Sequence, residues 1–258
     1  MSTFDILHPG PWFGPRQDPL GVSGEPSASD EKTRLLDICR HLKTGDFSAR
    51  SALEGYIRSC TEMALKCQAI RLYCYIARHE DIAFIGELLA KCGHDEVFAV
   101  VSYAPHTLSP QVVPYLFALF EEYDDTPIAE SILSAIDRLF PFQYEGEEVD
   151  IEALGQHFAG FAKELDANAY YYEGVEAFAG NLTKDLIENA ATARHQQVAF
   201  PLANTPTLLS IWSGEKCPVF YGDLVSDAGF EAVVNYVKSI AAMHWVRGEK
   251  YFYGHRIV

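Results

Sequence analysis

The sequence lacks the features of a membrane-spanning or exported protein. Its apolar runs, such as residues 97–101 and 112–120, are interrupted well before the roughly 18 residues needed to span a bilayer. The first residues, MSTFDILHPGPWFGPR, show no basic start followed by an apolar segment and a small-residue cleavage site, which a secretory signal requires. We therefore expect a cytoplasmic protein that does not contact the membrane.

The common catalytic motifs are also missing. No G-x-x-x-x-G-K-[ST], G-x-G-x-x-G, G-x-S-x-G or H-E-x-x-H occurs, so the sequence indicates no phosphate loop, nucleophile elbow or zinc-protease helix. None of the six cysteines forms a C-x-x-C pair, and we expect buried thiols rather than disulfides or metal ligands. Cys217 has no histidine in an interpretable order around it, so we do not expect a nucleophile there. These absences predict no catalytic residues, no metal and no cofactor.

Basic residues are scarce. The chain has 20 Lys and Arg against 36 Asp and Glu, which gives a formal charge of -16 and a pI of about 4.9. Such a charge opposes direct binding to nucleic acid or anionic lipid and favours a basic protein partner. The alternative is that the acidic surface only keeps the protein in solution.

The chain falls into three compositional regions. Residues 1–29 hold five prolines and four glycines and predict an irregular arm without regular elements. From Ser29 the apolar residues recur with a helical period up to about residue 165, whereas residues 166–258 are rich in glycine and tyrosine. We expect eight helices in the middle region, at about 30–43, 46–64, 66–78, 80–92, 94–104, 109–123, 126–140 and 149–165.

The later helices of the middle region suggest a structural repeat. When residues 66–78 are paired with 80–92, 94–104 with 109–123, and 126–140 with 149–165, successive pairs begin about 28 and 32 residues apart. Each pair carries apolar residues on more than one side, which a lone helical hairpin cannot bury, so the hairpins are expected to stack. The region is similar to short HEAT-like repeats over residues 30–165.

A small motif recurs three times after Asp166. A glycine (Gly174, Gly214 or Gly248) leads to a short aromatic or apolar run that ends at a second glycine, in FAGNL, FYGDL and FYGH. This pattern is typical of a small hairpin, although chance recurrence in a glycine-rich segment is the alternative. Helices are expected near 182–194 and 228–243. The whole sequence thus predicts a mostly α protein, a HEAT-like helical-hairpin array followed by a smaller α+β part with short β-hairpins.

Two helix starts combine imidazole and carboxylate groups. His79-Glu80-Asp81 and His94-Asp95-Glu96 occupy equivalent points of successive repeats and could bind iron or zinc. They are similar to the His-Glu pairs that hold the di-iron centre of deoxyhypusine hydroxylase, but that family has four such pairs and this sequence only one. Acidic residues are also favoured in a first helical turn by the helix dipole, so these positions have a structural explanation.

Acidic residues gather at two joints between helices, and three tyrosines follow them. The joints are expected on related edges of the stacked array, where they would attract a basic partner, although charge at a solvated joint is also ordinary. The tyrosines could serve as aromatic anchors of an interface or could pack subdomains together. The candidate partner-binding residues are Glu121, Glu122, Asp124, Asp125, Glu145, Glu147, Glu148, Asp150, Glu152, Tyr170, Tyr171 and Tyr172.

In size, charge and order of parts, the chain resembles the immunity proteins of bacterial polymorphic-toxin and contact-dependent inhibition systems. This resemblance implies that the protein is not an enzyme and that it binds and neutralises a cognate toxin, often a basic nuclease whose active site is occluded by acidic side chains. Two other functions remain open at this point: a HEAT-like metalloenzyme that uses His79 and His94, and a general helical-repeat scaffold or regulator.

Overall fold

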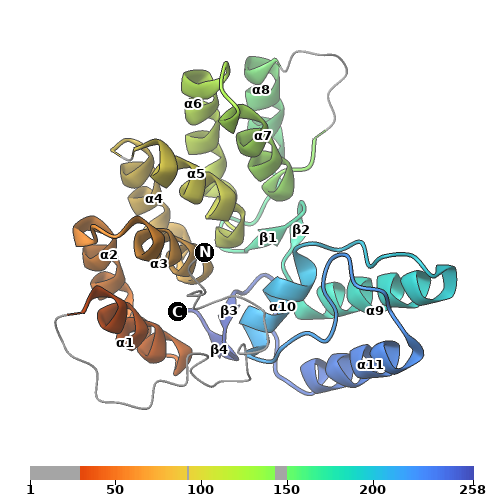
Figure 1. The fold of residues 1–258 in the computed structure, drawn as a ribbon. Coiled ribbons are helices and arrows are strands. Elements are labelled where there is room, and N and C mark those ends of the chain that lie inside the picture. The colour runs from red at the N-terminus through yellow and green to blue at the C-terminus, as the bar shows by residue number, and fades with distance from the viewer. Residues whose placement is uncertain (1–29, 92, 143–149) are drawn as a thin grey trace. The chain divides into compact units, whose positions relative to one another are not determined.

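The computed structural model describes residues 30–91, 93–142 and 150–258 (Figure 1). The chain forms two compact units. The central unit is Arg50–Ala177, and the other, which we call the terminal unit, combines the described residues up to Ala49 with Phe178–Ile257. From the composition we expected domain boundaries after residues 29 and 165, and these boundaries stay a prediction.

The central unit contains seven of the eleven α-helices of the described chain. They agree with the helical periods read from the sequence, with shifts of a few residues at their ends. Short 3-10 turns, His79–Asp81, Ala104–Thr107 and Pro110–Val112, lie between some of them. The helices are α2 (Arg50–Ser59), α3 (Met63–Ile76), α4 (Ile82–Leu89), α5 (His94–Tyr103), α6 (Val113–Tyr123), α7 (Ile128–Leu139) and α8 (Ile151–Ala162).

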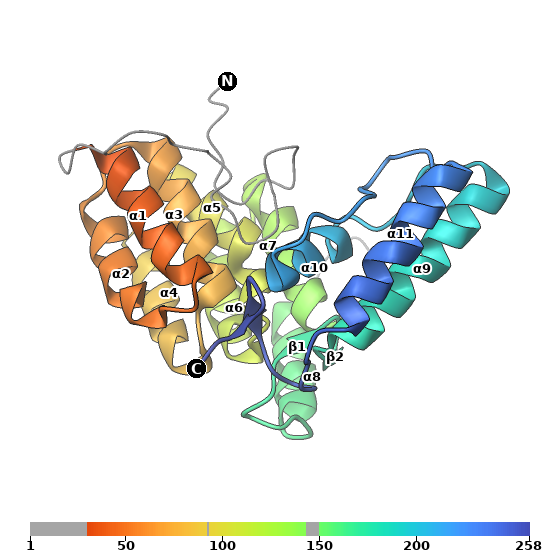
Figure 2. The ribbon, with the colours of Figure 1, turned by 90° about the horizontal axis from the view of Figure 1, so that it is seen from below.

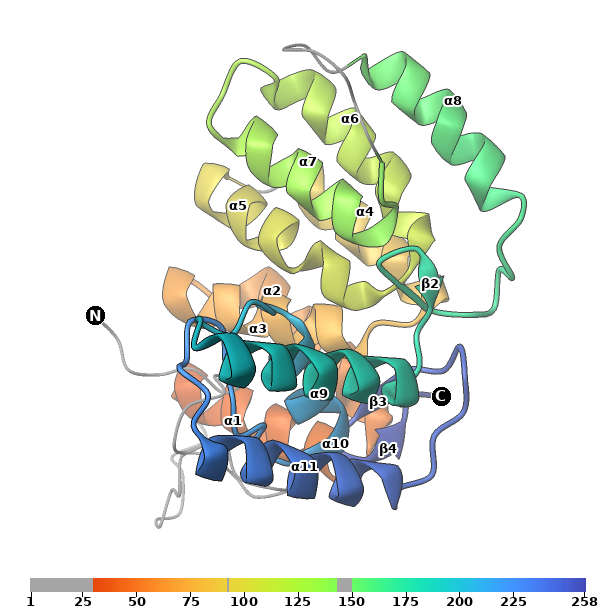
Figure 3. The same cartoon turned by 90° about the vertical axis from the view of Figure 1, so that its right-hand side faces the viewer.

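These helices stack as hairpins. α2 packs against α3, α4 against α5 and α6 against α7, while α3, α5 and α7 follow one another in one row and α4, α6 and α8 in a second (Figure 3). Successive hairpins begin at Arg50, Ile82 and Val113, which are 32 and 31 residues apart. The pairing expected from the sequence was wrong by one helix. The repeat period alone does not say whether a helix forms its hairpin with the helix before it or with the helix after it.

Burial on three sides explains the broad apolar surface of the inner helix α5. α5 packs against α3, α4 and α7, and its Val97, Val100 and Val101 are at most 1% exposed. Phe98, on the remaining side of α5, is 52% exposed. A single hairpin could not bury three faces, so stacking is required, as the sequence predicted. The HEAT-like character of these repeats stays a prediction.

A two-stranded hairpin ends the central unit. β1 (Tyr171–Tyr172) pairs antiparallel with β2 (Val175–Glu176), through a turn in which Glu173 and Gly174 both have positive φ, at 50° and 75°. Two positive φ values are typical of the type I′ turn, which matches the twist of a short hairpin. The amide of Tyr171 donates to the carbonyl of Leu108 (2.8 Å) and the amide of Glu173 to that of Arg138 (3.0 Å), so the hairpin is tied to the helices.

The terminal unit contains four helices and a second hairpin. α9 and α11 lie side by side, and α10 packs against α9 and β3 (Figure 2). The core includes Phe200, Trp212, Phe252 and Tyr253, each at most 1% exposed. The elements are α1 (Glu31–Lys43), α9 (Ala179–Gln196), α10 (Thr205–Ser213), α11 (Asp227–Ala241), β3 (Tyr251–Phe252) and β4 (His255–Arg256).

The glycine-aromatic motif gives a hairpin in one place as expected. β3 and β4 are joined by Tyr253 and Gly254, within the third copy. In the first copy the hairpin β1–β2 lies before the apolar run, with its turn at Glu173-Gly174. The apolar run that was expected to form a strand, FAGNL, begins helix α9 instead. The second copy has only an isolated bridge between Ala199 and Leu224. The prediction of a mostly helical protein with short hairpins is confirmed. No helix in the described part of the chain is both long and apolar enough to cross a membrane.

Candidate partner-binding surface

The first acidic joint is the turn between α6 and α7. Glu121, Glu122, Asp124 and Asp125 are all exposed there. The turn has a defined conformation, because the Asp124 carboxylate accepts a hydrogen bond from the Asp125 amide (2.9 Å) and the Thr126 hydroxyl donates to the Tyr123 carbonyl (2.8 Å). All four candidate carboxylates of this joint therefore face solvent from a fixed turn.

The second acidic joint precedes α8. Asp150 and Glu152 are exposed, and the Asp150 carboxylate caps the helix by accepting a hydrogen bond from the Ala153 amide at 3.0 Å. Both acids sit where the helix dipole favours negative charge. The other candidates of this joint, Glu145, Glu147 and Glu148, lie outside the described residues.

The packing of α6 on α8 brings the two joints together. The two helices run in opposite directions (Figure 1), and the ring of Phe117 on α6 meets that of Phe158 on α8 with centroids 5.8 Å apart. α6 ends at Tyr123 and α8 begins at Ile151, and both residues are about two helical turns from this contact. At a rise of 1.5 Å per residue, each helix end is therefore roughly 10 Å from the contact. We call this end of the central unit, with its six described acids, the acidic end: Glu121, Glu122, Asp124, Asp125, Asp150 and Glu152.

Positive charge is almost absent from this part of the chain. Residues 92–162 contain thirteen Asp and Glu but one Lys or Arg, Arg138, so they carry a formal charge of -12 out of -16 for the whole chain. The acidity of the sequence is therefore concentrated in residues 92–162 and is not spread evenly over the protein.

The tyrosine cluster is more buried than an exposed anchor would be. Tyr170 and Tyr171 are each 5% exposed, and Tyr172 is half-buried. The ring of Tyr170 stacks on that of His79 with centroids 4.2 Å apart, and the Tyr171 hydroxyl accepts a hydrogen bond from the Asp166 amide at 2.8 Å. These contacts favour the packing role for Tyr170 and Tyr171, and their part in partner binding stays a prediction.

The candidate metal cluster at residues 79–81 is engaged in packing and ion pairs. The Nδ1 atom of His79 lies 2.8 Å from the Ser109 hydroxyl, Glu80 forms an ion pair with Arg78, and Asp81 lies 3.2 Å from Arg50 and 3.1 Å from Arg78. The His94 side chain is outside what the structure describes. Among the described residues no three His, Cys, Asp or Glu side chains group as metal ligands. The structure gives no support to the metalloenzyme alternative.

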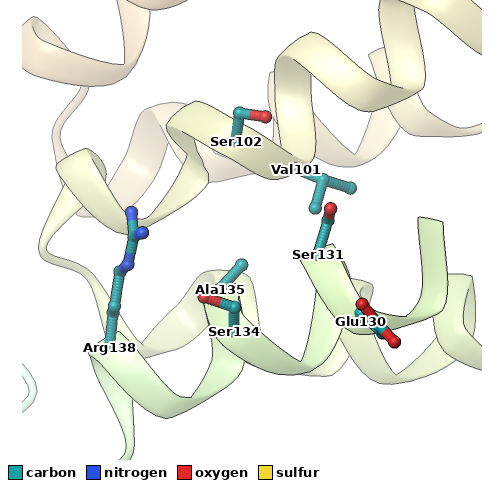
Figure 4. Close-up of a pocket in the computed structure, with 7 residues that line it drawn as sticks. All are labelled: Val101, Ser102, Glu130, Ser131, Ser134, Ala135 and Arg138. Atoms are coloured by element: carbon teal, nitrogen blue, oxygen red, sulfur yellow. The ribbon is translucent and has the colours of Figure 1, made fainter. Parts of the chain in front are cut away.

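A polar groove that the sequence did not reveal lies between α5 and α7. It has a volume of about 290 Å³ and contains three serines, a glutamate and an arginine (Figure 4). Serines on helices are common, and only the packing of α5 on α7 brings Ser102 to the residues of α7. Its lining residues are Val101, Ser102, Glu130, Ser131, Ser134, Ala135 and Arg138.

Comparison with known proteins decides the family. A family model described as immunity protein 47 matches residues 23–257, which is most of the chain. The chain belongs to the immunity protein 47 family. No curated protein and no solved structure matches it.

Membership of this family confirms the resemblance to immunity proteins seen in the sequence. The function of an immunity protein is to counter a toxin, so its partner is a toxin. The match spans helices of both compact units, from α1 to α11, and the hairpin β3–β4. The acidic end and the polar groove both lie within the matched residues.

Proposed function

We propose that this immunity protein binds a basic face of its cognate toxin through the acidic end and thereby covers the active site of the toxin. The observation that carries the proposal is the meeting of two acidic joints at one end of the central unit, within a stretch that has one basic residue. In this role the protein acts by stoichiometric binding in the cytoplasm and not as an enzyme.

Among the described residues, the exposed acids of this end lack the ion pairs that some other acids of the central unit make. Some carboxylates elsewhere in the unit pair with cations: Glu87 lies 3.0 Å from both Arg58 and Lys91, and Glu96 pairs with Lys66. In the described structure, Glu121, Glu122 and Glu152 take part in no ion pair. Like charges within a Debye length of about 8–10 Å repel one another, so an unpaired acidic surface lowers stability slightly. A basic partner would relieve this repulsion and would be attracted from a distance.

A nuclease is the toxin class that best fits this surface. An enzyme that acts on nucleic acid binds phosphates with Lys and Arg, so its active-site face is basic. Carboxylates placed on that face would compete with the phosphates of the substrate. Binding would then be fast at low salt and would weaken as salt is added.

Charge reversal tests the proposal. Glu121→Lys, Glu122→Lys and Asp125→Lys, combined in one variant, change exposed groups and leave the Asp150 helix cap and the Asp124 turn intact. Binding to the cognate toxin domain, in a catalytically inactive form, would be measured by biolayer interferometry. We expect about a 100-fold loss of affinity, mostly through slower association, and a flatter salt dependence.

A matched variant controls for net charge. Glu62→Lys, Asp185→Lys and Glu231→Lys reverse three exposed acids elsewhere in the chain and change the net charge by the same amount. This control should bind within about threefold of wild type, because exposed charges that do not belong to an interface contribute little. Equal losses in both variants would show a nonspecific effect of net charge and would contradict the proposed surface.

A further inference from the structure

The described groove between α5 and α7 concentrates polar side chains that make no hydrogen bond or ion pair within the described residues. In the part of the chain that the structure describes, the hydroxyls of Ser102, Ser131 and Ser134 form no hydrogen bond. Several helical hydroxyls elsewhere in this protein bond back to a carbonyl one turn earlier, as Ser210 does to Pro206 and Ser213 to Leu209, both at 2.7 Å. The groove hydroxyls are therefore available to a ligand.

Two opposite charges flank these hydroxyls. Glu130 and Arg138 lie eight residues apart on α7, which corresponds to about 12 Å along the helix. Neither side chain takes part in an ion pair among the described residues. Arg138 is also the single basic residue of the acidic stretch 92–162. Figure 4 shows it at one end of the groove and Glu130 near the other.

We propose that this groove binds a polar segment of the cognate toxin, with an acidic side chain of the toxin on Arg138 and a basic side chain on Glu130. The serine hydroxyls would hydrogen-bond to polar groups of the segment between these two charges. The inference rests on the proposed function and adds to it. The acidic end supplies general attraction to a basic toxin, whereas the groove selects the cognate toxin and fixes its register.

Charge complementarity is the reason to assign this occupant. A toxin that is only basic would be repelled by Arg138, so an acid is required at one position. The guanidinium group can bind a carboxylate through two parallel hydrogen bonds, which adds geometric specificity. A segment that carries its two charges in the reverse order would place like charges together at both ends of the groove. Such repulsion is a common way to exclude the wrong partner.

The test uses the full chain and the catalytically inactive cognate toxin domain. Arg138→Glu should lower the affinity about 30-fold or more, and the pair Ser131→Ala and Ser134→Ala about tenfold, in both cases through faster dissociation. Alanine is the best helix former, so the serine variant should melt at or above the wild-type temperature. Ser51→Ala and Lys216→Glu, at exposed positions outside the groove, are matched controls and should bind as wild type.

The outcomes separate this inference from the proposed function. If the groove variants bind as tightly as wild type while the reversal of Glu121, Glu122 and Asp125 abolishes binding, the groove assignment is wrong and the acidic end stands. If the groove variants lose affinity while the reversal of the acidic end has no effect, the groove is the binding site and the proposed acidic surface is wrong. If the wild-type protein does not bind this toxin domain, both are overturned.

Discussion

Phe117 of α6 and Phe158 of α8 meet edge to face, with ring centroids 5.8 Å apart and an interplanar angle of 73°. Phe158 also lies 5.3 Å from the ring of Phe140, at the end of α7. This aromatic cluster is the contact that fixes α8 beside α6. The position of the acidic end therefore depends on an apolar contact about two turns below it.

Removal of the Phe158 ring should therefore affect both stability and binding. Phe158 is 8% exposed, and Phe158→Ala should lower the free energy of unfolding by about 3 kcal/mol, the usual loss for a buried aromatic ring. Urea unfolding would measure it. Phe98→Ala, at a position 52% exposed, is the matched control and should cost less than about 1 kcal/mol. A similar loss in both variants would contradict the packing role of Phe158.

The hairpin turn at Gly174 gives a second prediction. Its φ is +75°, and an added Cβ would lie 2.9 Å from Cδ of Pro141, so Gly174→Ala should destabilise the protein by about 1–2 kcal/mol. Gly160, inside α8, has no atom within 4 Å of an added Cβ. Gly160→Ala should therefore stabilise by about 0.5–1 kcal/mol, and thermal unfolding of the two variants should shift in opposite directions. A shift of both in the same direction would show that the turn is not as described.

Asp81 illustrates the structural role of the cluster that resembled a metal site. Its carboxylate pairs with Arg50, whose side chain is 8% exposed, and with Arg78. Asp81→Asn would leave the Arg50 guanidinium in a mostly buried site without its counter-charge, at a cost of about 3 kcal/mol in unfolding experiments. Glu80→Gln, at an exposed position, should cost less than about 1 kcal/mol. A loss of bound metal in the Asp81 variant, with unfolding unchanged, would instead revive the metalloenzyme alternative.

The thiol of Cys217 should be inert in the folded protein. Burial raises the pKa of Cys217 from 9.0 to about 12, so the reactive thiolate is scarce at neutral pH. Because the pKa is higher in the folded state, this thiol favours folding only below pH 9, and its contribution is lost as the pH rises from 9 towards 12. Mass spectrometry after iodoacetamide labelling at pH 8 should show Cys217 unlabelled and the half-buried Cys67 labelled faster. Rapid labelling of native Cys217 would show that its site opens.

The sequence predicts the helices well and their partners less well. Apolar residues recur with the helical period from α1 to α8, so each helix could be located within a few residues. The choice of hairpin partners depends on tertiary packing that a period does not encode. α10 was missed because its nine residues, TPTLLSIWS, are buried on nearly every side and show no polar face.

The same distinction applies to the candidate site. Charge and exposure could be inferred for Glu121 to Asp125 and for Asp150 and Glu152, since acids at helix ends are usually solvated. Their proximity follows only from the antiparallel packing of α6 and α8. The burial of Tyr170 and Tyr171 could not be inferred, because an aromatic run serves a core and an interface equally well. The groove could not be predicted from the sequence either, because its residues come from two helices that only the fold brings together.

Hydrogen–deuterium exchange of the protein alone and in a 1:1 complex with the inactive toxin domain tests directly whether the acidic end contacts the toxin. We expect slower exchange in the complex at the α6–α7 turn, residues 121–127, and at the start of α8, residues 150–155. Exchange on α9 and α11, which belong to the terminal unit and are not part of the proposed surface, should not change. Protection confined to α9 and α11, with no change at residues 121–127 and 150–155, would contradict the acidic end as the toxin-binding surface.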